Sequence, residues 1–194
     1  DVLIPRPETE LLVELALAHA PQSGTVRALD LGTGSGIVAL TLALEQPAWQ
    51  VDAVDCSPAA LTVASDNAQR LGAANVRLRH SDWYGSLASD ERFHLIVSNP
   101  PYIHASDPHL AQGDLRFEPA GALTDHADGL SCIRAIIDGA RHHLLPHGWL
   151  LFEHGYDQAT ECRRLLAQAG FGQVASVSDL AGIERVTLGR LPAG

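Results

Sequence analysis

Apolar and polar positions along the chain follow two alternating patterns. Short apolar runs such as residues 93–97 have the length of buried strands, while Leu11, Leu12 and Leu15 recur at helical spacing. Helices are predicted at residues 8–20, 36–44, 58–71, 130–145 and 158–169. Strands are predicted at residues 26–31, 51–55, 76–79, 93–98, 149–153, 174–178 and 185–188. Strands that alternate with helices predict an α/β fold with a doubly wound, mostly parallel sheet.

One long segment, residues 103–128, has no predicted helix or strand and is polar and rich in turn-forming residues. Loops of this length are uncommon in compact domains unless they are functional or disordered. The segment directly follows a polar motif at the end of a predicted strand. This position favours a functional loop.

The motif is Asn99-Pro100-Pro101-Tyr102, placed behind the apolar run of residues 93–97. Two prolines remove two backbone donors and end the strand, so the Asn99 and Pro100 carbonyl groups become available acceptors beside the Asn99 carboxamide. Such a group can hold an NH2 group by both of its protons, with Tyr102 as an aromatic wall. The alternative is an ordinary Pro-Pro turn.

A glycine-rich segment closes the first predicted strand and opens the following helix, with the sequence Gly32-Thr33-Gly34-Ser35-Gly36. Glycines let a ligand approach the backbone, and a helix N-terminus offers free N–H groups to an anion. Asp55 follows about 20 residues later, where a ribose-binding acid is expected. We therefore predict a nucleotide-type cofactor. Gly34 to Ala39 also fits the dinucleotide pattern G-x-G-x-x-A, so the spacing does not identify which cofactor binds.

Trp83 follows the third predicted strand within Ser81-Asp82-Trp83. In a doubly wound sheet this turn reaches over the same pocket, where an indole can stack on a purine and a carboxylate can accept from an exocyclic amine. Trp83 as an ordinary core residue is an equally good interpretation.

Composition narrows the possible chemistry. The chain has 194 residues, enough for one α/β domain, and its net charge of -10 disfavours nucleic acid as the principal partner. All 13 basic residues are arginine, which excludes lysine-dependent phosphate loops, Schiff bases and nucleophiles. Three cysteines without Cys-x-x-Cys spacing favour reduced thiols over disulfides or a zinc site.

Other signals are weaker. No apolar stretch is long enough to span a membrane and no signal peptide is visible, so we expect a soluble, cytoplasmic protein. The chain begins at Asp1 and has no methionine, so we expect that its natural start has been removed. His142, His143 and His147 lie near a predicted helix C-terminus, where the helix dipole favours histidine over a metal site. Glu153 and His154 end a strand and are interpreted as a satisfied pair at the rim.

Taken in order, these motifs resemble class I S-adenosylmethionine-dependent methyltransferases that act on planar nitrogen. More narrowly, the chain resembles the HemK/PrmC family, the peptide chain release factor glutamine N5-methyltransferases. The supporting stretches, beyond the two motifs above, are Leu3-Ile4-Pro5-Arg6-Pro7-Glu8-Thr9-Glu10, Phe117-Glu118-Pro119, Glu153-His154-Gly155 and Asp179-Leu180-Ala181-Gly182. The proline-containing first stretch is the most specific to the family.

The resemblance implies a fold, a reaction and a set of roles. It implies a seven-stranded Rossmann-like sheet with a C-terminal antiparallel strand, S-adenosylmethionine as the cofactor, no metal, and a release factor as the protein substrate. The glycine-rich segment would hold the methionine moiety, Asp55 the ribose, Trp83 the adenine, and Asn99 both cofactor and substrate. Asn99-Pro100-Pro101-Tyr102 would bind the glutamine amide, with Asn99 and Pro100 as the catalytic acceptors. Residues 1–21 would be a remnant of the interdomain linker with the first helix, and residues 22–194 the methyltransferase domain, without the helical N-terminal domain of the family.

Three other functions remain open at this point. A nucleic-acid methyltransferase acting on an exocyclic base amine would use the same acceptors, but it would need a flipped base and a basic groove. An NAD-dependent oxidoreductase would use the G-x-G-x-x-A pattern, yet no hydride-transfer site follows Asp55. An inactive cofactor-binding module is disfavoured by the intact motif at residues 99–102.

Overall fold

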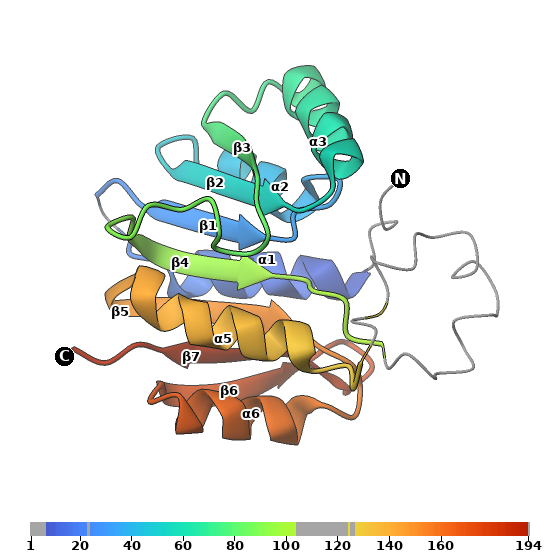
Figure 1. Ribbon diagram of the computed structural model, residues 1–194, viewed down its shortest axis with the longest axis vertical. Coiled ribbons are helices and arrows are strands. Elements are labelled where there is room, and N and C mark those ends of the chain that lie inside the picture. Colours follow the sequence, from blue (N-terminus) through green and yellow to red (C-terminus); the bar gives the residue numbers. More distant parts are fainter. Residues whose placement is uncertain (1–6, 23, 104–123, 125–126, 194) are drawn as a thin grey trace, which may run out of the picture.

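The computed structural model describes residues 7–22, 24–103, 124 and 127–193, and its centre is a seven-stranded sheet (Figure 1). The strands are β1 (Arg27–Leu31), β2 (Gln50–Asp55), β3 (Val76–His80), β4 (Phe93–Ser98), β5 (Leu144–Glu153), β6 (Gly172–Ser178) and β7 (Glu184–Arg190). Their order in the sheet is β3-β2-β1-β4-β5-β7-β6. The first five strands are parallel, and β7 pairs antiparallel with both of its neighbours. The predicted mostly parallel sheet with a C-terminal antiparallel strand is therefore confirmed.

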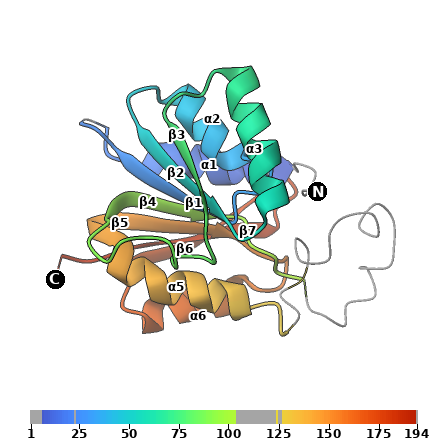
Figure 2. The ribbon, with the colours of Figure 1, turned by 45° about the horizontal axis from the view of Figure 1, so that its top comes forward.

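Helices cover both faces of the sheet. They are α1 (Pro7–His19), α2 (Ile37–Glu45), α3 (Pro58–Leu71), α5 (Ser131–His143) and α6 (Ala159–Gln168). In Figure 2, α1, α2 and α3 lie above the sheet and α5 and α6 below it. Each face has its own buried apolar cluster, because the strands are apolar on both sides, as expected for parallel strands covered by helices.

Local sequence explains where the helices begin and end. Ser57 caps α3 by accepting a hydrogen bond from the Ala60 N–H at 3.2 Å, and Pro58 occupies the first turn, where its missing N–H costs nothing. Gly72 ends the helix in the left-handed conformation, with φ +70°. The boundaries predicted for this helix are confirmed.

The predicted end of α5 and the predicted start of β5 are both wrong. The helix expected to reach residue 145 ends at His143, and Leu144 is already extended and starts β5. Pro146 explains the difference, because a proline disfavours helical geometry at the residue before it and removes the N–H of its own position. β5 accordingly begins earlier than predicted, and its pairing with β4 shifts register between Phe93 and Leu95.

Helix α1 packs directly on the sheet. Leu12 and Ala16 are fully buried in the cluster that also contains α2 and the strands, and the His19 ring meets Trp149 edge-on at 4.5 Å. Burial of a leucine side chain contributes about 1.5–3 kcal/mol, so α1 is firmly held. The predicted division of the chain at residue 21 stays a prediction.

Parts of the sequence predictions fall outside the described residues. These are the stretch at residues 3–6, most of the predicted loop at residues 103–128 and Phe117-Glu118-Pro119. Within the described ranges, no helix has the length and apolar character needed to cross a membrane.

Candidate active site

The two main motifs begin side by side at the carboxyl edge of the sheet. Leu31 of β1 is in register with Ser98 of β4, and the Ser98 hydroxyl donates a hydrogen bond to the Leu31 carbonyl oxygen at 2.8 Å. The next residues along the two strands are therefore Gly32 and Asn99. β1 and β4 lead to helices on opposite faces of the sheet, which is the topological switch point where ligands bind in open α/β sheets. The sequence motifs thus meet at the expected place.

The glycine-rich turn is held open by backbone geometry. Gly32, Gly34 and Gly36 all have positive φ angles, which side-chain-bearing residues rarely adopt. The N–H groups of Gly32 and Thr33 both donate to the Val54 carbonyl oxygen at 2.9 Å, which ties the turn to β2. Among the described residues, a Cβ atom added to Gly34 would meet nothing within 4 Å. The turn therefore leaves open space at its centre.

Asp55, at the end of β2, uses both carboxylate oxygens on this edge. Oδ2 accepts from the Gly34 N–H and Oδ1 from the Ser57 N–H, each at 2.8 Å. A carboxylate has about four acceptor positions, so two further hydroxyl donors can still bind. The predicted neighbourhood of Asp55 and the glycine-rich turn is observed, and Asp55 also fixes the position of that turn.

Asp30, the residue before the last of β1, supports the glycine-rich turn from the buried side and is 1% exposed. Its Oδ2 atom accepts from the Thr33 hydroxyl at 2.7 Å and from the Ala39 N–H at 3.2 Å. Burial, the largest cause, raises the pKa of Asp30 to about 7, although the two hydrogen bonds act in the opposite direction. Asp30 therefore joins the turn to the first turn of α2.

The N-terminus of α2 faces this edge without a side-chain cap. Gly36 occupies the cap position in the left-handed conformation, and no acidic residue lies in the first turn. No acid of the helix itself lies at the positive end of its dipole, and Asp30 takes only the Ala39 N–H there, so this end still favours an anionic group. Ser35 is held from the side, because the Asn67 carboxamide donates to its carbonyl oxygen at 3.0 Å.

Trp83 lies over the first glycine of the turn. It has a φ of +45°, and its Cζ3 atom is 3.8 Å from the position of a Cβ atom on Gly32. The Ser81 hydroxyl donates to the Trp83 carbonyl oxygen at 2.8 Å and accepts from the Ser86 N–H at 2.9 Å, which closes this turn. The indole is half-buried and packs against the apolar cluster that contains Leu29 and Leu31. The Trp83 side chain thus packs on the core and also lines the carboxyl edge of the sheet beside the glycine-rich turn.

The motif at residues 99–102 is tied to two other elements. Asn99 Nδ2 donates to Thr9 Oγ1 of α1 at 3.2 Å, and Thr9 Oγ1 donates to Glu153 Oε2 of β5 at 3.3 Å. The Tyr102 hydroxyl donates to Glu153 Oε1 at 3.0 Å. Neither Asn99 Oδ1 nor the Pro100 carbonyl oxygen accepts a hydrogen bond from any residue that the structure describes. These two oxygens are the acceptors that the sequence predicted.

Glu153 and His154 do not form the rim pair expected from the sequence. Adjacent strand residues point to opposite faces, so Glu153 faces the 99–102 motif while His154 turns into the sheet. His154 Nε2 lies 2.8 Å from Thr187 Oγ1, and its Nδ1 lies 2.9 Å from the Gly155 carbonyl oxygen. Burial is the largest cause that lowers the pKa of His154. Each side chain is satisfied, but by different partners.

Gln158, at the start of α6, connects three backbone segments near the motif. Its Nε2 donates to the carbonyl oxygens of Tyr102 at 3.0 Å and Gly129 at 3.2 Å, and its Oε1 accepts from the Gly155 N–H at 2.8 Å. One side chain thus holds the end of the 99–102 motif, the approach to α5 and the turn after β5.

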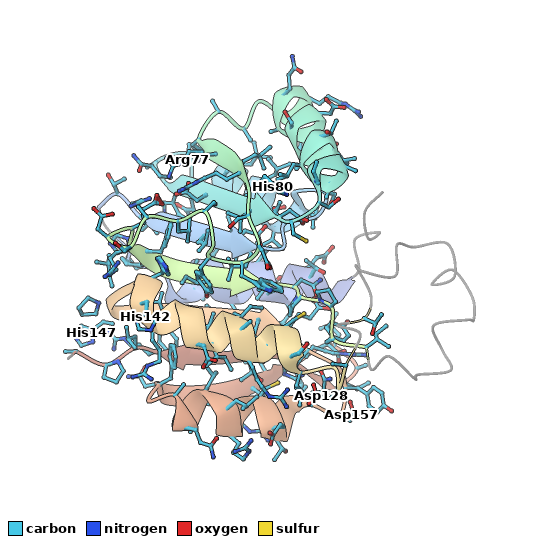
Figure 3. All side chains as sticks on the ribbon, viewed as in Figure 1. Arg77, His80, Asp128, His142, His147 and Asp157 are labelled. Carbon is cyan, nitrogen blue, oxygen red and sulfur yellow. The ribbon has the colours of Figure 1, made fainter. Side chains whose placement is uncertain are left out.

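The three histidines considered as a zinc site do not converge. Figure 3 shows His142 and His147 at the end of the molecule opposite Asp128 and Asp157, at the amino end of β5. His143 points inward, stacks on Tyr84 at 5.1 Å between ring centroids and lies 3.0 Å from the Glu91 carbonyl oxygen. Within the described part of the chain, no three His, Cys, Asp or Glu side chains are grouped as metal ligands.

Comparison with known proteins identifies the family. The model of a protein family described as "Methyltransferase small domain" matches residues 7–117 of this chain. The release factor glutamine methyltransferase of Bordetella pertussis is 58% identical over 191 residues, covering 98% of this chain and 70% of that protein. The enzyme of the same name from Pseudomonas aeruginosa is 54% identical over 188 residues, covering 97% of this chain and 67% of that protein.

The chain belongs to the release factor glutamine methyltransferase family. The resemblance read from the motifs is therefore confirmed. Solved structures support the fold of this methyltransferase. A methyltransferase from Pyrococcus furiosus aligns with a TM-score of 0.71 at 16% identity, covering all of this chain and 86% of that one. A Thermus thermophilus 16S rRNA methyltransferase, solved with AdoMet and guanosine, aligns with a TM-score of 0.70 at 22% identity, covering 97% of this chain and 44% of that one.

Sequence reasoning missed how three residues of this methyltransferase serve the site. Thr9 lies inside the family-specific first stretch, and Glu153 inside another quoted stretch, yet neither was connected with Asn99. Nothing in the sequence marks Gln158 beyond its place at the start of a helix. All three act through contacts with residues distant in sequence, which a local pattern does not show.

Proposed function

We propose that this protein transfers a methyl group from S-adenosylmethionine to the side-chain amide nitrogen of a glutamine in a peptide chain release factor. The observation that supports this reaction most directly is the position of Asn99 Oδ1 and the Pro100 carbonyl oxygen. They follow β4 in register with the glycine-rich turn after β1. Two acceptors for a planar NH2 group thus lie next to a cradle for the methyl donor. The names of the relatives point to the same substrate.

The glycine-rich turn fits this cofactor. Gly34 leaves open space where a side chain would stand, and the uncapped N-terminus of α2 suits the carboxylate of the methionine moiety. We assign Gly32, Thr33, Gly34, Ser35 and Gly36 to the methionine moiety, Asp55 to the ribose hydroxyls, Trp83 to the adenine and Asn99 to the edge shared with the substrate. When bound, the cofactor supplies a methyl group on a cationic sulfur, which leaves with the bonding electron pair.

The 99–102 motif would prepare the substrate amide. An amide nitrogen is a weak nucleophile because its lone pair is delocalised into the carbonyl group. Asn99 Oδ1 and the Pro100 carbonyl oxygen would accept hydrogen bonds from its two N–H groups and so direct the lone pair toward the methyl group. Once the carbon–nitrogen bond has formed, the nitrogen loses one of these protons to solvent and the product is a neutral N-methyl amide. Both acceptors gain strength as positive charge develops on the nitrogen, and therefore stabilise the transition state more than the ground state. Pro101 and Tyr102 complete the wall around the glutamine side chain.

The test is methyl transfer to a defined atom. Purified protein is incubated with a release factor and labelled S-adenosylmethionine, and the labelled residue is mapped by mass spectrometry. We expect one methyl group on a glutamine side chain. A release factor with asparagine at the mapped position is the control and should remain unlabelled. Label found only on DNA or RNA in a parallel reaction would contradict the proposal.

A cytoplasmic location follows as part of the same proposal, because peptide chain release factors act in translation. Fractionation of cells that produce a tagged form of the protein would test it. Recovery of the protein with the membrane fraction would contradict it.

A further inference from the structure

A chain of hydrogen bonds connects Asn99 to a buried carboxylate. It runs from Asn99 Nδ2 to Thr9 Oγ1 and from the Thr9 hydroxyl to Glu153 Oε2, and Tyr102 donates to the other Glu153 oxygen. Thr9 is 4% exposed and Glu153 is 1% exposed. The four residues come from α1, from the segment after β4 and from the end of β5, and they are brought together only by the fold.

The chain of hydrogen bonds has a direction, because the Glu153 carboxylate determines which group donates at each step. Glu153 accepts at both of its oxygens, at Oε2 from Thr9 and at Oε1 from Tyr102, so the single proton of the Thr9 hydroxyl is used toward Glu153. Thr9 Oγ1 can then only accept from Asn99. The NH2 end of the Asn99 carboxamide is the end that donates, so it must face Thr9 and Oδ1 must face the other way.

The two ends of an asparagine carboxamide have nearly the same shape, so packing alone does not choose between them. A reversed Asn99 would present an NH2 group to the substrate NH2 group, and donor would meet donor. Thr9 accepts from Asn99 at 3.2 Å and donates to Glu153 at 3.3 Å, and both distances are long for hydrogen bonds. The orientation of the carboxamide therefore depends on which partner donates and which accepts, rather than on the strength of either bond.

We propose that Thr9 and Glu153 are positioning residues that fix the orientation of the Asn99 carboxamide and so keep Oδ1 directed at the methyl-accepting amide. This inference rests on the proposed function for its catalytic consequence, but not for its structural part. Glu153 also holds Tyr102, so one buried carboxylate orients both polar side chains of the motif. Helix α1 thereby contributes to the site through Thr9.

The test compares Thr9→Val, which keeps the shape and loses the hydroxyl, with Thr9→Ser, which keeps the hydroxyl. Turnover of release factor, its KM, the affinity for S-adenosylmethionine and the Asn99 side-chain NH2 resonances in nitrogen-15 spectra are measured for each. We expect Thr9→Val to lower kcat roughly tenfold, the effect of about one hydrogen bond, and to shift the Asn99 resonances. Cofactor affinity should change by less than about twofold, and Thr9→Ser should restore both readouts.

A double-mutant cycle separates positioning from a general structural role. If Thr9 acts through Asn99, Thr9→Val should have no further effect on single-turnover rates once Asn99 is alanine. An equal loss in both backgrounds would overturn the proposal. Glu153→Gln provides an independent variant, because its amide can donate to Thr9 and so permit the reversed orientation. It should lower kcat in the same way.

The structural and functional parts can fail separately. Unchanged Asn99 resonances in Thr9→Val would overturn the inference whatever the activity. A shift of these resonances with wild-type kcat would also overturn it, because orientation would then not matter for turnover. If neither wild-type protein nor Thr9→Ser methylates a glutamine, the proposed function is wrong, and the resonances still decide whether Thr9 orients Asn99.

Discussion

Gly34 donates its backbone N–H to the Asp55 carboxylate at 2.8 Å and so joins the turns that follow β1 and β2. The two residues are 21 positions apart in sequence, Gly34 in the turn after β1 and Asp55 at the end of β2, its parallel neighbour. Gly34 leaves open space for a ligand and Asp55 supplies a carboxylate, so the part of each residue in cofactor binding can be tested separately.

Replacement of Asp55 by asparagine should weaken S-adenosylmethionine binding by roughly 10- to 100-fold. The carboxylate would lose its charge and one end of its acceptor capacity, and hydrogen bonds to charged groups contribute about 1.5–3 kcal/mol. Calorimetric titration measures the affinity. Asp66→Asn is the matched control, because Asp66 is exposed on α3. Unchanged affinity in Asp55→Asn would remove Asp55 from the cofactor site.

Replacement of Gly34 by alanine tests close approach of the ligand. A Cβ atom there meets no atom of the described residues within 4 Å, so the expected cost to folding is that of the positive φ of +57°, about 1–2 kcal/mol. Gly72→Ala is the matched control, since it also has a positive φ and open space but ends α3. Denaturant unfolding should show similar losses of stability for both variants. Only Gly34→Ala should lose cofactor affinity, and equal affinities would place the ligand elsewhere.

Replacement of Asn99 by alanine should lower turnover by about a hundredfold or more, as loss of a transition-state hydrogen bond does in other enzymes. Cofactor affinity should fall much less, because the glycine-rich turn and Asp55 remain. Steady-state rates with release factor and a cofactor titration measure the two effects. A variant with a near wild-type rate would show that Asn99 is not the acceptor.

Replacement of Gln158 by alanine should destabilise the protein by about 1–3 kcal/mol, because two part-buried hydrogen bonds to backbone carbonyl groups are lost and each contributes about 0.5–1.5 kcal/mol. Since one of those carbonyls belongs to Tyr102, KM for the release factor should also rise. Gln168→Ala, exposed at the end of the same helix, is the control. If both variants have the same KM, Gln158 does not support the substrate wall.

The raised pKa of Asp30 predicts a pH dependence of stability. Its ordinary value is 3.8 and its value in the folded protein is about 7, so between these values the folded protein retains a proton that the unfolded chain has lost. The contribution of Asp30 to the free energy of unfolding is therefore complete below pH 4. It is lost as pH rises to about 7, by up to roughly 4 kcal/mol.

Unfolding of wild-type protein and of Asp30→Asn across this range measures the effect, because the variant lacks the titration. Their difference should move in favour of the variant as pH rises. Asp52→Asn is a control of opposite sign. Burial alone would raise the pKa of Asp52, but hydrogen bonds from Arg77 and Arg79 lower it, so its stabilising contribution is lost as pH falls below about 4. A constant difference for Asp30→Asn would contradict the raised pKa.

Much of the fold follows from local chemistry. Apolar runs, Ser57 with Pro58 at a helix start and glycines at turns all act within a few residues, so the order of helices and strands was predictable. The helix expected to reach residue 145 ends at His143, because Pro146 disfavours helical geometry at the residue before it and this effect outweighs the apolar pattern. Glu153 and His154 were expected to face the same rim as a satisfied pair, and both are satisfied, but strand geometry directs them to opposite faces.

The sequence by itself determined the succession of strands and helices along the chain, the glycine-rich turn, Asp55 and the 99–102 motif, because each depends on residue type and spacing over a short stretch. Only the tertiary structure decided that Thr9 meets Asn99, 90 residues away, and that Glu153 holds both Thr9 and Tyr102. The orientation of a carboxamide depends on the donors and acceptors around it. Those partners come from α1 and β5, which only the packing of the whole sheet brings to the site.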